Sequence, residues 1–287
     1  MEDRTEDRTE DRTEDRKLSE MTIENYNVFL DRLKRNYDNN ITDFDKVCEY
    51  IYSIGKSLSN EKMYFQALHH HFRITKPELA LKYKIEFTKI AKKMTDKTKE
   101  QLSTDKEKDR YMNYPEIQKT AKEVLDGDAP LEDKLLVGFY CLMPPVRRDY
   151  ESLTIYSKKP SESDVSGVGN YIVMGRTPTV FIQEHKTAKK HGAMIRRIPA
   201  EVIPLLKEWK RLNPDKKLFD KTPQTLSKKL KTLFNALTGK KITVNTIRHS
   251  FVNHHRGNEM PLTQKEELAK IMGHSVGMNE LYRRVDV

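Results

Sequence analysis

The sequence has little that would anchor it in a membrane, export it or cross-link it. No stretch approaches the roughly 20 consecutive apolar residues of a membrane-spanning helix. The N-terminus alternates charges where a secretory signal peptide would have a basic start and an apolar core. The only cysteines, Cys48 and Cys141, form no CxxC pair, so we expect neither a disulfide framework nor a thiolate zinc cluster. These absences favour a protein that works inside a cell, in the cytoplasm or nucleus.

Apolar residues are also sparse, at 36% against 33% charged residues, so part of the chain is expected to be solvated. The length of 287 residues is still enough for two domains of roughly 150 residues each. The net charge is +10, although residues 2–16 hold eight acids and only four arginines. The rest of the chain is therefore strongly basic, which favours a polyanionic partner such as nucleic acid. Charge alone does not decide this, because lysine-rich helices occur in many proteins.

Residues 1–17 repeat Glu-Asp-Arg-Thr and contain no apolar side chain after Met1, which predicts a disordered tail. Apolar residues at helical spacing from residue 18 to 94 then predict a bundle of four helices. Ser19, Asp43 and Ser59 are the expected caps of the first three helices, and Pro77 suits the first turn of the fourth. Residues 95–110 are polar without an apolar face, which predicts a linker.

Residues 111–287 combine helical patterns with three short strand patterns separated by turns, at 171–174, 180–182 and 193–195. The fold class expected is therefore mainly α, with an N-terminal helical bundle and a mixed α+β domain that contains a small antiparallel sheet.

Four short segments of this second domain hold residue types that bind phosphate. They are Pro144-Pro-Val-Arg-Arg-Asp-Tyr150, His185-Lys-Thr187, Asn245-Thr-Ile-Arg-His-Ser250 and Gly273-His-Ser275, and Tyr282 follows eight residues after His274. In this order they resemble the catalytic domain of the tyrosine recombinases, the lambda-integrase-like or phage integrase family. That family has an arginine on a helix, a lysine in a β-hairpin turn, then HxxRH, GH and a tyrosine about nine residues on.

The resemblance covers residues 111–287 and implies that the helices at 18–94 form a core-binding domain that clamps DNA. It also implies a nucleophile, Tyr282, which would attack the scissile phosphate and form a 3′-phosphotyrosyl intermediate. Arginine suits the stabilisation of such a phosphate, because its planar fork binds two oxygens and keeps its proton. Arg248 and an arginine of the Pro144 segment would be the two clamps.

The first clamp has three possible registers. Alignment on the apolar residue before the arginine selects Arg147, which we prefer, whereas alignment on the following acid selects Arg148 with Glu151. A third register places Val146 at the catalytic position and would imply an inactive relative.

The resemblance assigns the remaining roles. Lys186 would protonate the leaving 5′ oxygen, with Lys189 and Lys190 as rivals that would otherwise bind DNA together with Arg148. His274 would hydrogen-bond the phosphate. Asn245 stands where the family more often has histidine or lysine, so it can donate to phosphate but cannot exchange a proton.

The chemistry implied needs no metal and no other cofactor. His69-His-His71 and His254-His255 lack acid or cysteine partners at ligand spacing, which argues against a zinc site. The expected partner is double-stranded DNA, with a homotetramer on DNA and a monomer in isolation. The function expected is site-specific recombination or integration, as in viruses and mobile elements. A type IB topoisomerase and a catalytically silent DNA-binding protein are the alternatives.

Deletion of residues 1–16 should leave the fold intact and slightly tighten nonspecific DNA binding at low salt, because it removes negative charge from a basic protein. Circular dichroism and a DNA titration at low and moderate salt would measure both effects. Loss of folded protein on this deletion would show that the repeat is structural.

Overall fold

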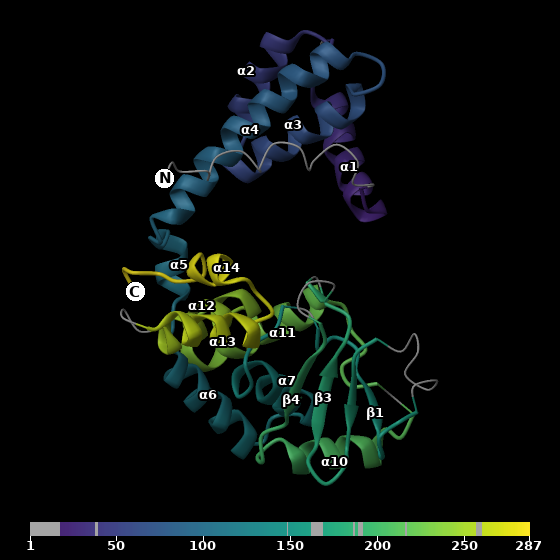
Figure 1. Ribbon diagram of the computed structural model, residues 1–287, viewed down its shortest axis with the longest axis vertical. Helices are drawn as coiled ribbons and strands as arrows, with labels where there is room; N and C mark the ends of the chain where they lie inside the picture. Colours follow the sequence, from purple (N-terminus) through teal and green to yellow (C-terminus); the bar gives the residue numbers. More distant parts are fainter. Residues whose placement is uncertain are drawn as a thin grey trace, which may run out of the picture. The chain divides into compact units, whose positions relative to one another are not determined.

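The computed structural model describes residues 18–37, 40–147, 149–161, 169–185, 187–188, 192–215, 217–256 and 260–287. The chain divides into two compact units, Met1–Glu100 and Gln101–Val287 (Figure 1). The predicted tail at 1–17 lies outside the described residues. None of the described helices is both long and apolar enough to cross a membrane.

The first unit contains the helices α1 (Glu20–Asn36), α2 (Phe44–Ile54), α3 (Leu58–Phe72) and α4 (Pro77–Lys99). Ser19 and Asp43 cap α1 and α2 as predicted. The cap of α3 is Ser57, not Ser59, because the Ser57 side chain accepts from the backbone of Asn60. The apolar faces of these helices meet in one core, whose fully buried members include Val47, Ile51, Phe65, Leu68 and Tyr83.

The segment at 95–110, predicted to be a linker, is largely helical. The helix α4 continues to Lys99, and a short helix, α5 (Asp105–Arg110), follows. A reciprocal capping box begins α5, in which Thr104 accepts from the backbone of Glu107 while the Glu107 carboxylate accepts from the backbone of Thr104. Polar capping thus forms a helix here without an apolar face.

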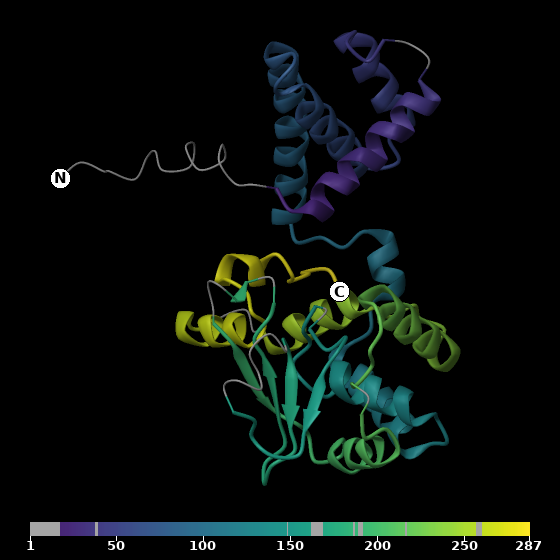
Figure 2. The same cartoon turned by 90° about the vertical axis from the view of Figure 1, so that its right-hand side faces the viewer.

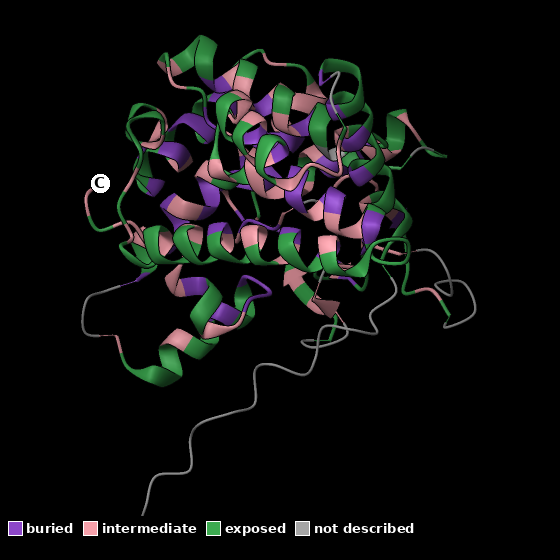
Figure 3. Ribbon diagram, turned by 90° about the horizontal axis from the view of Figure 1, so that it is seen from above, coloured by how far each residue is buried: buried purple, intermediate pink, exposed green. Residues whose placement is uncertain are grey.

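Besides the short helices α5 and α14, the second unit contains six helices of ten or more residues among its described residues. They are α6 (Tyr114–Asp126), α7 (Leu131–Cys141), α10 (Ile203–Leu212), α11 (Pro223–Thr238), α12 (Val244–His255) and α13 (Leu262–Ile271). The helix α7 lies at the centre of the core, since all residues from Leu135 to Cys141 are buried. Helices α6, α10, α11 and α12 pack against it. Figure 3 shows that the helices generally carry both buried and exposed residues, as amphipathic packing requires.

A four-stranded sheet packs beside these helices in the order β1 (Thr154–Tyr156), β2 (Tyr171–Val173), β3 (Thr179–Ile182) and β4 (Met194–Arg197) (Figure 2). The small sheet confirms the predicted fold class in general. It is mixed, however, because β1 pairs parallel to β2 and only the other two pairs are antiparallel. The first strand was not predicted, and the residue before it, Leu153, forms an antiparallel bridge with Leu218 through two backbone hydrogen bonds.

Helices α12 and α13 and the short helix α14 (Val276–Glu280) lie over one end of this sheet (Figures 1 and 2). Arg196 on β4 fastens this arrangement, because its guanidinium donates to the carbonyls of Pro144 and Ile271. The Pro144 segment and the Gly273 turn are thereby held next to the same strand.

Candidate active site

Tyr282 follows α14 and is 8% exposed. Its hydroxyl accepts a hydrogen bond from Arg147 at 3.2 Å. The rings of His249 and His274 flank its ring, each with a centroid separation of 4.8 Å. The side chain therefore contacts an arginine at its hydroxyl and two imidazole rings at its own ring.

Arg248 is a buried cation in the middle of the site, with 1% of its surface exposed. It projects from α12, donates to the carbonyl of Pro145 at 2.8 Å and donates to Nε2 of His274. Its guanidinium carbon lies 5.0 Å from the centre of the Tyr282 ring, a cation–π distance. Burial lowers the pKa of Arg248, while the interaction with Tyr282 opposes that shift. The Arg248 Nε has no hydrogen-bond partner among the described residues.

The two arginines change the acidity of Tyr282. Burial by itself raises the pKa of this phenol, but the positive charge of Arg248 and the hydrogen bond from Arg147 outweigh it, so the pKa lies below its ordinary value. A lower pKa favours the phenolate, the form of tyrosine that is nucleophilic.

Some side chains of the Pro144 segment lie in the core of the second unit, and others lie at the site. Val146 is buried in the core of the second unit, whereas Arg147 reaches Tyr282. Arg148 lies outside the described residues. Asp149 lies nearby, and burial raises the pKa of its carboxyl although His185 and Arg248 oppose the shift. Of these two neighbours, Arg147 is the one that hydrogen-bonds the phenol, whereas Val146 contributes to the core.

The segment before β4 reaches the site through Thr187, which donates to the carbonyl of Gly273 at 2.7 Å. His185 lies within 3.2 Å of the Thr187 hydroxyl and within 2.8 Å of the Gly192 carbonyl. Lys186, Lys189 and Lys190 lie outside the described residues. No role was predicted for His185 and Thr187, although both flank Lys186 in the His185-Lys-Thr187 motif.

The glycine before His274 is required by backbone geometry. Gly273 has a φ of +63°, and a side chain there would also approach the sulfur of Met194 to 3.2 Å. His185, Thr187, Gly273 and His274 line a small cavity of about 30 Å³ together with Arg147 and Arg248. His274 and Thr187 therefore share one compact space.

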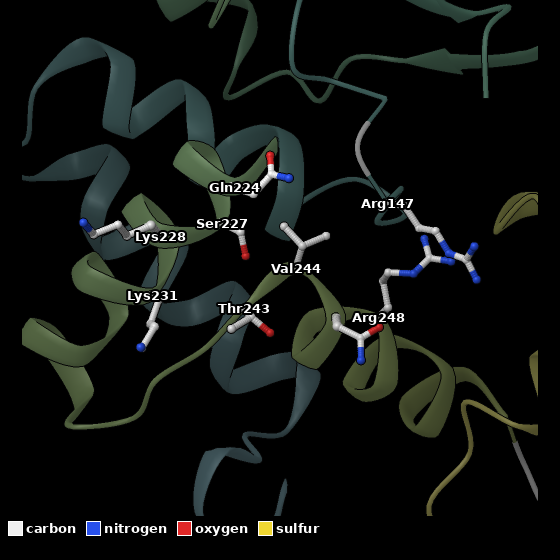
Figure 4. A pocket seen from close by; sticks show the side chains of 9 residues that line it. Arg147, Gln224, Ser227, Lys228, Lys231, Thr243, Val244 and Arg248 are labelled. Carbon is white, nitrogen blue, oxygen red and sulfur yellow. The ribbon is translucent and has the colours of Figure 1, made fainter. Parts of the chain in front are cut away.

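A larger groove of about 590 Å³ opens beside the arginines (Figure 4). Asn245, in the first turn of α12, lines this groove together with Arg147 and Arg248. Figure 4 shows the two arginines at one end of the groove and Lys228 and Lys231 of α11 at the other. Lys229 on the same helix is used differently, because it pairs with Glu132 of α7 at 2.7 Å. One face of α11 thus serves packing and the other supplies cations to the groove.

The remaining histidines in the described part of the chain pack against rings or bond to the backbone. His69 hydrogen-bonds the carbonyl of Ala80, and His255 that of Phe251. His70 lies against Tyr26. Over the described part of the chain, no group of three or more His, Cys, Asp or Glu side chains is arranged to hold a metal ion.

The lowered pKa of Tyr282 can be tested without DNA. Replacement of Arg147 by Gln removes one of the groups that lower it, so the pKa of Tyr282 should rise. Titration of tyrosine ring-carbon NMR signals, with Tyr282→Phe to assign the resonance, would measure this. Arg176→Gln, at an exposed turn position, is the matched control and should have no effect. An unchanged pKa in Arg147→Gln would contradict the electrostatic coupling.

The comparisons with known proteins come from structure alone, because no family model and no curated protein matches the sequence. The chain is similar to the crystal structure of XerA recombinase, with 15% identity and a TM-score of 0.41, over 92% of this chain and 87% of that chain. It is also similar to selenomethionine protelomerase TelA covalently complexed with substrate DNA, with 14% identity and a TM-score of 0.44, over 94% of this chain and 89% of that chain. The assignment of a function therefore depends on the geometry of the site.

Proposed function

We propose that this protein is a DNA strand transferase of the tyrosine recombinase type, which breaks and rejoins DNA through Tyr282. The observation that carries the proposal is the convergence of two arginines on one buried phenol: Arg147 donates to its hydroxyl and Arg248 lies against its ring. In the proposed step the Tyr282 oxygen forms a bond to phosphorus and the bond from phosphorus to the 5′ oxygen breaks. The phenol loses a proton and the leaving oxygen gains one. Reversal with another 5′ hydroxyl rejoins the strand.

The two arginines have a further role once DNA is bound. Displacement at phosphorus increases the negative charge on the non-bridging oxygens, and fixed donors in a shielded site stabilise that charge. Arg248 suits this role because it is already desolvated and held by Pro145, so little reorganisation is needed. Arg147 is the second clamp in this proposal.

His274 and Lys186 complete the proposed chemistry. Arg248 donates to Nε2 of His274, so this ring nitrogen is an acceptor in the free protein. We assign His274 to the scissile phosphate and Lys186 to protonation of the 5′ oxygen. The bond from Thr187 to Gly273 supports the second assignment, since it ties the residue next to Lys186 to the turn that carries His274.

The groove beside the arginines is the proposed path of the DNA backbone. Its polar lining includes Asn245, Thr243, Ser227 and the ammonium groups of Lys228 and Lys231, in a chain of net charge +10. Hydroxyl, amide and ammonium donors are the groups that contact phosphates in protein–DNA interfaces. Asn245 would donate to phosphate without exchanging a proton.

The outcome we propose for this chemistry is recombination or integration between two DNA sites, by a protein that is monomeric alone and tetrameric on DNA. A type IB topoisomerase would use the same groups on a single duplex. An assay that follows both exchange between two sites and relaxation of one supercoiled plasmid distinguishes the two, and light scattering with and without DNA measures the oligomeric state.

Tyr282→Phe should abolish covalent attachment to DNA and leave binding within about twofold, because only the attacking hydroxyl is lost. A nicked substrate that traps the covalent complex, resolved on a denaturing gel, gives the readout. Tyr171→Phe, in the same unit, is the control and should still form the complex. A covalent complex with Tyr282→Phe would place the nucleophile elsewhere, with Tyr150 and Tyr171 as the next candidates.

Lys228→Ala and Lys231→Ala should each weaken DNA binding across all sequences and reduce the slope of log K against log salt by about 0.9, the value for one lost phosphate contact. Fluorescence anisotropy over a series of salt concentrations would measure the slope. Lys207→Ala, at an exposed position of α10 outside the groove lining, should leave the slope unchanged. Equal effects at all three positions would show that the groove has no special role.

A further inference from the structure

The peptide that carries Tyr282 has little regular structure of its own. The helix α14 is five residues long and ends at Glu280, and the described residues 281–287 form no helix or strand. Within the peptide, the backbone of Tyr282 donates to the carbonyl of Asn279 at 3.0 Å. A five-residue helix and one turn do not fix the direction of a side chain by themselves. Contacts from other parts of the chain must hold the phenol beside Arg147.

Most of these contacts come from residues 101–108, which we call the strap. Gln101 donates from its side chain to the carbonyl of Glu280 at 2.9 Å, and its own carbonyl accepts from the backbone of Val285 at 3.0 Å. The backbone of Ser103 donates to the Asp286 carboxylate at 2.8 Å. The strap thus contacts the peptide on both sides of Tyr282.

Two ion pairs also join the strap to the peptide that carries Tyr282. Glu107 accepts from Arg284 at 3.1 Å, and Lys108 lies 2.9 Å from Asp286. Lys108 is the main cause that lowers the pKa of Asp286 to about 2, so this pair stays charged at any pH of a DNA assay.

Helix α12 holds the peptide from a second direction. The carbonyl of Tyr282 lies 2.6 Å from Nδ1 of His249, and the backbone of Arg284 donates to the side chain of Asn253 at 2.8 Å. Burial lowers the pKa of His249 to about 4, so the ring is neutral at neutral pH and donates from Nδ1 to this carbonyl. Because α12 also carries Arg248, that clamp and the nucleophile share one support.

We propose that the strap is a positioning element, in which Glu107 and Lys108 act through Arg284 and Asp286 to orient Tyr282 for attack. The proposal rests on the proposed function of Tyr282 as nucleophile. A misplacement of about 1 Å at reacting atoms costs up to about 100-fold in rate, so contacts that never touch DNA can still control the reaction. Glu107 and Lys108 belong to this element, whereas Tyr282 and the arginines are the groups that would touch DNA.

The test uses Glu107→Gln in the full chain. Glutamine keeps a side-chain oxygen that can accept from Thr104 in the capping box of α5, but it removes the charge that binds Arg284. Glu116→Gln is the matched control, because Glu116 closes the same kind of capping box on α6, where it accepts from Asn113. Asp286→Asn is the second variant: it keeps an acceptor for Ser103 and loses the charge that pairs with Lys108.

Three measurements separate positioning from a general loss of stability. In Glu107→Gln and Asp286→Asn, hydrogen exchange at the Val285 amide should accelerate. The pKa of Tyr282 should rise in both variants, because its hydroxyl moves away from Arg147. Formation of the covalent complex should slow about tenfold, while DNA affinity stays within about twofold of wild type. Glu116→Gln should change none of them. An Arg284→Lys variant, which keeps the charge opposite Glu107, should recover part of the rate that Arg284→Gln loses.

The proposal is overturned if either Glu107→Gln or Asp286→Asn leaves all three measurements unchanged. It is also overturned if hydrogen exchange accelerates while the pKa of Tyr282 and the rate of covalent-complex formation stay the same. Equal slowing by Glu116→Gln would also overturn it, since the effect would then be one of stability. Failure of the proposed function gives a different result: the wild type forms no covalent complex through Tyr282, while the exchange and pKa measurements still report whether the strap orients the phenol.

Discussion

The buried charge of Arg248 is the constraint to which the rest of the site conforms. A guanidinium that is 1% exposed has lost its hydration, and an unpaired charge in such a place is strongly unfavourable. The protein compensates with a carbonyl from the Pro144 segment, a ring nitrogen of His274 and the face of Tyr282. Each partner comes from a different part of the chain. Their convergence explains why the Pro144 segment and the Gly273 turn lie at the same end of the sheet.

The sheet is small, but it determines where the turn containing His274 can lie. Met194 of β4 packs against Gly273 so closely that a side chain would not fit without movement. Arg196, two residues along the same strand, joins the Pro144 carbonyl to that of Ile271. The alternation of side chains along a strand places both residues on one face. A single four-residue strand therefore positions two of the segments that contribute to the site.

The sequence predicted the site best where the residues of a motif are close together in the chain and lie on one helix or turn. Arg248 lies on the helix that begins after the Thr243 cap, and His274 follows Gly273, whose positive φ favours glycine at that position. The strap could not be predicted, because its contacts join residues that are about 180 positions apart and are polar. Because the segment has no apolar periodicity, the sequence predicted a linker there. The strand β1 was also not predicted, since it has only three residues and the backbone bridge beside it joins Leu153 to the distant Leu218.

The free protein holds Tyr282 where part of a bound phosphate must also be accommodated. The phenol oxygen receives the hydrogen bond of Arg147, a donor that the proposed chemistry also requires for a phosphate oxygen. The two demands are compatible because a guanidinium presents five N–H donors in one plane. The Arg248 Nε adds a donor that has no partner among the described residues. In the proposed chemistry, a phosphate that enters from the groove would therefore bind Arg147 without first displacing the phenol.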